Sequence, residues 1–269
     1  MKDNIFNIAK NIFLDTVNPQ DYVELESIST FYRTLHACVL KPLKMVLLYG
    51  KPGTGKSMLL AKLHDELSQT QKVYLYKTPI IDESEFYKTL AQDLLSVNYE
   101  GELNFTQFIK ILNNLLSKEV PIILLDEAQL YSNSLMEKIR LLSDTRKLKF
   151  VITLHKTDKE DLIAKEHFQT RIWESIELNN TSSEELKFYI HKKLLQASCL
   201  DVANMFNNNA VNLIYKLTKG NYRDSHKLLY TLLQIYSWYY EHSPSKIRHN
   251  KISTKIVEMA AMHVGLLDA

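Results

Sequence analysis

Glycine and cysteine are both scarce in this chain of 269 residues, which has six glycines and two cysteines. The cysteines, Cys38 and Cys199, lie in apolar helical patterns, with no C-x-x-C pair and no metal-binding spacing. Isolated apolar cysteines of this kind are typical of buried, reduced thiols in a cytoplasmic protein. The pattern therefore argues against a disulfide framework and against a cysteine-based metal site.

Long apolar runs and a strong excess of charge are also missing. No run approaches the length of a membrane-spanning helix, and the N-terminal MKDNIFNIAKNIF is too polar for a signal peptide. The net charge is +2, so DNA binding is not indicated by charge, although a local basic patch remains compatible with DNA as a ligand. We therefore expect a cytoplasmic protein with no direct membrane insertion.

Between residues 44 and 178, short apolar runs alternate with helical patterns. The expected strands cover residues 44–50, 72–78, 120–128, 149–155 and 171–178. The expected helices cover residues 1–14, 27–40, 56–68, 83–97, 105–118, 133–145 and 158–165. Strands that alternate with helices predict an α/β fold with a parallel sheet and right-handed crossovers.

After residue 180 only helical patterns remain, near residues 182–197, 208–218, 222–241 and 251–265. A capping box, Thr181 or Ser182 with Glu184 or Glu185, begins the first of them. We therefore expect two domains. Residues 1–180 would form an α/β domain with N-terminal helices, and residues 181–269 would form a small all-helical domain.

Three of the six glycines lie in the motif GKPGTGKS of residues 50–57. It fits G-x-x-x-x-G-K-[ST] and stands between an expected strand and an expected helix, which is the context of a P-loop. Glycines let backbone N–H groups turn inward around phosphate oxygens, and the helix N-terminus adds positive charge. Lys56 is predicted to bind the β- and γ-phosphates of ATP, and Ser57 to bind Mg²⁺. The predicted ATP-binding residues of this loop are Gly50, Lys51, Pro52, Gly53, Thr54, Gly55, Lys56, Ser57 and Met58.

A pair of carboxylates follows the expected strand in IILLDEAQ, residues 122–129. Four apolar residues bury this strand and place Asp126 at its carboxyl end beside the loop, where it can bind ATP-bound Mg²⁺ together with Ser57. Glu127 faces another side and is predicted to polarise the water that attacks the γ-phosphate. Alone, the pair would be an ordinary charged strand end. With the P-loop present, it predicts an ATPase with ATP and Mg²⁺ as ligands.

With these motifs in order, the chain resembles an AAA+ ATPase, a P-loop NTPase sheet domain followed by a helical lid, over nearly its whole length. More narrowly, it is similar to the bacterial ATPases of the general secretion pathway protein A and MSHA pilus biogenesis type, to which transposition helper ATPases are related. The stretches that carry the resemblance are LLYGKPGTGKSMLL, IILLDEAQ, FQTRIWESIELNNTSSEELKFYIHKKLLQA and LTKGNYRDSHKLL.

The resemblance implies roles for further residues. Arg223 matches the lid arginine called sensor 2, which reaches the γ-phosphate from the second domain; a helix-surface arginine is the alternative. Arg171 matches an arginine finger for a neighbouring subunit's nucleotide, which implies an ATP-dependent homo-oligomer; an ordinary surface arginine or an intramolecular pair is the alternative. Thr153 and His155 both fit the polar sensor 1 position, and the choice between them stays open.

Two classes of function follow from the resemblance. In the first, the protein is a cytoplasmic motor or switch for an envelope machine of secretion, type IV pilus assembly or DNA uptake. With neither a membrane segment nor a peptidoglycan-binding domain in the chain, it would dock at the inner membrane through a membrane-machine protein partner. In the second, it is a DNA-directed ATPase that assists transposition or replication. The fold serves both classes and does not separate them.

Overall fold

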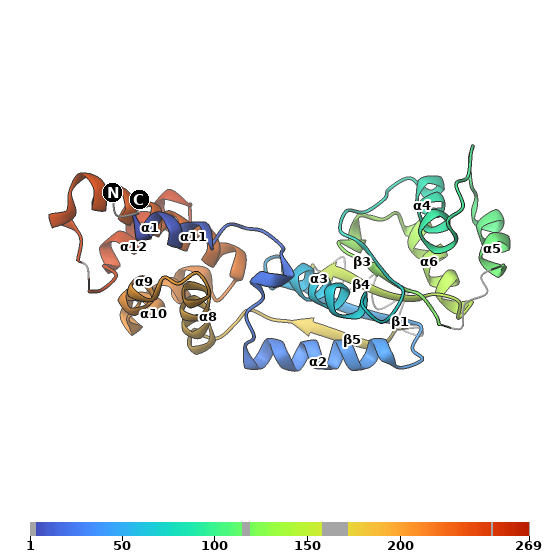
Figure 1. Cartoon of the computed structure of the whole chain (residues 1–269), viewed down its shortest axis with the longest axis horizontal. Coiled ribbons are helices and arrows are strands. Elements are labelled where there is room, and N and C mark those ends of the chain that lie inside the picture. The colour runs from blue at the N-terminus through green and yellow to red at the C-terminus, as the bar shows by residue number, and fades with distance from the viewer. Residues whose placement is uncertain (1–3, 115–118, 158–171, 249, 269) are drawn as a thin grey trace. The chain divides into compact units, whose positions relative to one another are not determined.

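The computed structural model of the chain describes residues 4–114, 119–157, 172–248 and 250–268 (Figure 1). The chain divides into two compact units. The sheet unit comprises residues 30–178, and the helical unit comprises residues 1–29 and 179–269.

Five parallel strands form the sheet of the sheet unit. They are β1 (Met45–Gly50), β2 (Val73–Tyr76), β3 (Ile122–Leu125), β4 (Lys149–His155) and β5 (Ile172–Leu178). Their order in the sheet is β2-β3-β4-β1-β5, and every neighbouring pair is parallel. The predicted α/β fold with a parallel sheet is therefore confirmed. Strand β4 lies between β1 and β3, the two strands that end in the predicted motifs.

Helices of the sheet unit alternate with these strands as the sequence predicted. They are α2 (Glu26–Leu40), which begins just before the unit, α3 (Lys56–Leu67), α4 (Glu83–Leu95), α5 (Phe105–Asn113), α6 (Asn133–Asp144) and the short 3-10 helix η2 (Ala128–Leu130). Asn104 caps α5 in a complete capping box with Gln107, because each side chain accepts from the other residue's backbone N–H. The helix expected at residues 158–165 lies outside the described residues.

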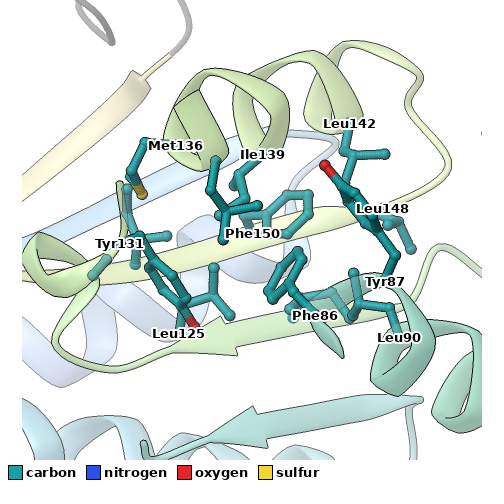
Figure 2. Close-up of a cluster of buried hydrophobic side chains, with 14 of the residues drawn as sticks. Phe86, Tyr87, Leu90, Leu125, Tyr131, Met136, Ile139, Leu142, Leu148 and Phe150 are labelled. Atoms are coloured by element: carbon teal, nitrogen blue, oxygen red, sulfur yellow. The ribbon is translucent and has the colours of Figure 1, made fainter. Parts of the chain in front are cut away.

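A buried core joins α4 and α6 to the sheet (Figure 2). Phe86 on α4, Ile139 on α6 and Phe150 on β4 are all fully buried. Tyr87 on α4 stacks on Phe108 of α5, with ring centroids 5.1 Å apart. Removal of this apolar surface from water stabilises β3 and β4 in the sheet, and so supports the loops that follow them.

The helical unit contains α1 (Ile5–Asn11), η1 (Pro19–Asp21), α8 (Ser183–Gln196), α9 (Leu200–Met205), α10 (Asn208–Thr218), α11 (Tyr222–His242), η3 (Pro244–Lys246) and α12 (Thr254–His263). Ser182 caps α8, since its hydroxyl accepts from the N–H of Glu185. Helix α9 was not predicted, because six residues are too few to show a helical period. Within the part of the chain that the structure describes, no helix is both long and apolar enough to cross a membrane.

The N-terminal segment packs inside the helical unit. The Phe6 ring on α1 lies 5.3 Å from the ring of Tyr236 on α11, and Asn4 Nδ2 donates to the carbonyl of Ser237 at 3.1 Å. The sequence-based division joined residues 1–29 to the sheet. In the structure they lie with the helices, because their buried side chains contact α11.

Candidate functional site

The glycine loop connects the end of β1 to the start of α3. A side chain at Gly50 is excluded, since its Cβ would lie 2.3 Å from the carbonyl oxygen of Leu178 on β5. Gly53 and Gly55 have φ angles of 78° and 95°, which residues with a side chain rarely adopt. Gly55 is the N-cap of α3, so the loop delivers the chain directly into the first turn of a helix of 12 residues.

Lys56 lies folded into this loop. The residue is only 5% exposed. Its ammonium donates to the carbonyl oxygens of Gly50 and Lys51, at 2.9 Å each. The Thr54 hydroxyl donates to the same Lys51 carbonyl at 2.9 Å. A buried ammonium beside a helix N-terminus suits an anionic group such as a phosphate. The residues present therefore fit a nucleotide.

Asp126 follows β3 and lies next to the neighbouring strand β4. It is 6% exposed, and its Oδ1 accepts a hydrogen bond from the fully buried hydroxyl of Thr153. The backbone N–H of Glu127 donates to Thr153 Oγ1 at 2.9 Å and to Asp126 Oδ1 at 3.0 Å. These bonds tie both predicted acids to one threonine on β4.

Glu127 has an unusual backbone, with φ 50° and ψ 44° in the left-handed region. That conformation is uncommon for a residue with a side chain and persists where surrounding bonds impose it, often at functional sites. Its carboxylate lies 3.8 Å from His155 Nε2, and the His155 ring and backbone contact the side chain of Gln129. The polar side chains of Glu127, Gln129 and His155 therefore lie together where β3 and β4 end.

A second polar group lies at the end of β1. The hydroxyl of Tyr49 donates to Glu177 at 3.1 Å, and the ammonium of Lys156 also bonds to the Glu177 carboxylate. The bond from Lys156 is the main reason why the pKa of Glu177 lies below its usual range. The N–H of Lys156 also donates to the Gly50 carbonyl at 2.8 Å. These bonds hold the start of the glycine loop against β4 and β5.

The other predicted residues are distributed as follows. Ser57 and Met58 are half-buried in the first turn of α3, and Lys51 and Pro52 are exposed on the loop. Arg223 lies at the start of α11 in the helical unit, where its Nε is 3.3 Å from Asp15 Oδ2. Arg171 lies outside the described residues. The structure thus groups the P-loop residues at β1 and the acids at β3, with β4 between them.

Sequence patterns did not reveal the grouping of Gln129 with His155, nor that of Tyr49 and Lys156 with Glu177. Each set joins residues from different strand ends, and only the strand order brings these ends together. The sequence feature that could identify such residues is a polar residue at the end of an apolar strand. This feature identified Asp126, and it fits His155, which remained one of two candidates for the sensor 1 position.

Three comparisons relate this chain to known proteins. A family model described as AAA domain matches residues 41–161. A search of curated proteins found no match. Among solved structures, the chain is similar to Cdc6p from Pyrobaculum aerophilum, with a TM-score of 0.64 and 15% identity over 95% of this chain and 71% of that one.

Two further structures share the fold. For the Orc1 protein of Aeropyrum pernix in complex with DNA, the TM-score is 0.65 at 15% identity, over 95% of this chain and 69% of that one. For the RuvB Holliday junction branch migration motor of Thermotoga maritima, the TM-score is 0.57 at 19% identity, over 94% and 73%. Likeness at these identities shows the fold alone. With its glycine loop, five-stranded parallel sheet and helical C-terminal region, this chain has the P-loop AAA+ ATPase fold, and residues 41–161 match the AAA domain.

Proposed function

We propose that this chain binds ATP with Mg²⁺ at the glycine loop and hydrolyses the ATP to ADP and phosphate. The observation that supports this best is that Lys56, the two acids and the polar residues of β4 all lie at the carboxyl ends of neighbouring strands. The buried ammonium of Lys56 follows β1, and the tied acids Asp126 and Glu127 follow β3. Strand β4 links the two sides through Thr153 and His155.

Each residue has a distinct task in the proposed reaction. Bound ATP supplies the phosphoryl group, and Mg²⁺ supplies positive charge on its phosphate oxygens. Lys56 and the first turn of α3 bind the phosphates, and Ser57 and Asp126 hold the metal ion. Glu127 accepts the proton of the attacking water as the new oxygen–phosphorus bond forms and the bond to the ADP oxygen breaks.

Two substitutions test the proposal. Glu127→Gln keeps the size of the side chain and removes the base, so we expect unchanged ATP binding and hydrolysis slower by about 10²-fold or more. Lys56→Ala is expected to lose nucleotide affinity. Lys62→Ala, on the same helix with its ammonium over the Tyr32 ring, serves as the lysine control. Binding is followed with a fluorescent ATP analogue and turnover by phosphate release. Hydrolysis by Glu127→Gln at the wild-type rate would show that Glu127 is not the base.

We propose further that the ATPase works as a cytoplasmic motor or switch for an envelope machine, through a membrane-protein partner, as its resemblance to the secretion and MSHA ATPases implies. The alternative is a DNA-directed ATPase that assists transposition or replication, and the fold serves both roles. Two of the similar structures are an Orc1 protein in complex with DNA and a Holliday junction motor.

A salt titration of DNA binding, with and without a non-hydrolysable ATP analogue, separates the two roles. Nucleotide-dependent binding that weakens steeply with salt would overturn the envelope role and support the DNA-directed one. No binding at low salt, in either condition, would support the envelope role.

Assembly and the two arginines belong to the same proposal. Arg171 is proposed to act on the nucleotide of a neighbouring subunit in an ATP-dependent homo-oligomer, and Arg223 to contact the γ-phosphate as sensor 2. Arg171→Ala and Glu127→Gln subunits should each be inactive alone. If Arg171 acts in trans, a mixture regains hydrolysis, because one subunit supplies the arginine and the other the base. A mixture as inactive as its components would overturn action in trans.

A further inference from the structure

Both ends of the Gln129 side-chain amide are used on a single residue, His155. Gln129 Oε1 accepts from the backbone N–H of His155 at 3.3 Å, and Gln129 Nε2 lies 3.3 Å from His155 Nδ1. The reverse amide orientation would place the Gln129 NH₂ group against the His155 N–H, two donors facing each other. The amide orientation is therefore determined by its partners.

That orientation determines the tautomer of the His155 ring. An amide nitrogen only donates, so His155 Nδ1 must accept from it. The proton of the neutral imidazole then lies on Nε2. Nε2 is the ring atom 3.8 Å from Glu127 Oε1. The ring thus presents its donor to the carboxylate of the proposed base.

The backbones on both sides of this contact are held in place. Bonds from the Glu127 N–H to Asp126 and Thr153 fix the left-handed turn that begins η2. His155 pairs in register with Gly50, the first residue of the glycine loop. The side chains of Glu127 and His155 are 38% and 24% exposed, so the contact lies at the edge of the buried site.

We propose that Gln129 and His155 are positioning residues, which together orient the Glu127 carboxylate toward the water that it deprotonates. The inference rests on the proposed function. Gln129 acts only through His155, since it sets the ring orientation and the tautomer. Loss of either residue should lower kcat and leave ATP affinity unchanged, because Lys56, which binds the phosphates, and Ser57, which binds Mg²⁺, are untouched.

The test compares two substitutions at His155. His155→Phe keeps a ring and removes the donor, and His155→Gln places an amide donor where Nε2 stood. We expect kcat to fall about 10- to 100-fold in His155→Phe, as is typical when a group that orients a reacting side chain is lost. We expect His155→Gln to retain most of the kcat, and the KM for ATP and the Kd of an ATP analogue to stay unchanged in both variants.

A double-mutant cycle then tests the link to Gln129. Gln129→Leu should lower kcat in the wild-type background and have little further effect in His155→Phe. Equal kcat loss in His155→Phe and His155→Gln, or additive losses in the cycle, would overturn the inference.

Wild-type and Glu127→Gln proteins measured alongside separate this outcome from failure of the proposed function. If Glu127→Gln is inactive and His155→Phe is fully active, the positioning role alone is wrong. If Glu127→Gln hydrolyses ATP at the wild-type rate, the base itself has been misassigned.

Discussion

At the scale of single residues, the carboxyl end of β4 determines how the acids of β3 are held. Thr153 is fully buried and bonds to both Asp126 and the backbone of Glu127. His155, two residues further along the same strand, points its ring at the Glu127 side chain. The two candidates for the sensor 1 position thus contact different parts of the same segment. Thr153 contacts the Glu127 backbone and Asp126, the proposed metal-site acid, and His155 contacts the side chain of Glu127, the proposed base.

Thr153 offers a direct test of this division. Thr153→Val removes the hydroxyl that bonds to Asp126, so we expect a higher Mg²⁺ concentration for half-maximal ATPase and a loss of about 1–2 kcal/mol in unfolding free energy. Thr153→Ser keeps the hydroxyl and should retain the wild-type Mg²⁺ dependence. The measurement is phosphate release across a Mg²⁺ titration. Identical Mg²⁺ curves for the two variants would contradict the proposed part of Thr153.

At the scale of elements, the turn between α10 and α11 is constrained by the start of α8. Gly220, in this turn, has a φ of 73°, and its carbonyl accepts from the N–H of Thr181 at 3.1 Å. A Cβ at Gly220 would lie 2.1 Å from the Thr181 carbonyl oxygen. Both the backbone angle and the close approach therefore require glycine at this position.

Gly265 separates these two effects, because its φ is 74° and nothing lies within 4 Å of its Cβ position. Gly265→Ala should cost only the backbone strain, about 1–2 kcal/mol of unfolding free energy. Gly220→Ala should cost roughly 1–3 kcal/mol more, because the new methyl group displaces α8. Urea unfolding of both variants gives the difference. Equal costs would mean that the turn can move away from α8.

The contact of α11 with α8 also includes a buried histidine. His226 Nε2 lies 2.6 Å from the Tyr189 hydroxyl, and the two rings are stacked. Burial, followed by the charge of Lys193, lowers the pKa of His226 to about 4. The unfolded chain, with its ordinary histidine pKa near 6.5, binds a proton between about pH 6.5 and 4 that the folded protein does not. His226 therefore leaves the unfolding free energy unchanged above about pH 6.5 and lowers it as the pH falls from 6.5 toward 4.

Unfolding free energies at two pH values test this contribution. Between pH 7.5 and pH 5, the wild-type protein should lose roughly 2 kcal/mol through His226. His226→Gln cannot titrate and still presents an amide to Tyr189, so its loss over the same interval should be smaller by that amount. The same pH dependence in both proteins would show that another group is responsible.

At the scale of the whole molecule, the N-terminal helix α1 completes a unit built mainly from residues 179–269. Phe6 on α1 is 2% exposed and contacts the rings of Tyr236 and Tyr240 on α11, whereas Ile8 on the same helix is 47% exposed. Helix α1 therefore presents one apolar face to the helical unit and leaves the other in solvent.

Truncation of these two side chains tests that dependence. Phe6→Ala should lower the unfolding free energy by roughly 3–5 kcal/mol, because it leaves a cavity against α11. Ile8→Ala should change it by about 0.5 kcal/mol or less, since the side chain is already exposed. Thermal unfolding followed by circular dichroism provides the comparison. Equal midpoints for both variants would contradict the assignment of residues 1–29 to the helical unit.

The amino-acid sequence by itself determined the strands and most helices, the glycine loop and the two acids. Those features depend on local patterns: apolar runs, helical periods, capping residues and the P-loop spacing. The tertiary structure decided which strand ends meet, and so placed β4 between the loop at Gly50 and the acid Asp126. It also placed residues 1–29 with the helical unit and gave Gln129 its partner, His155. These outcomes depend on packing between segments far apart in the chain, which no local pattern encodes.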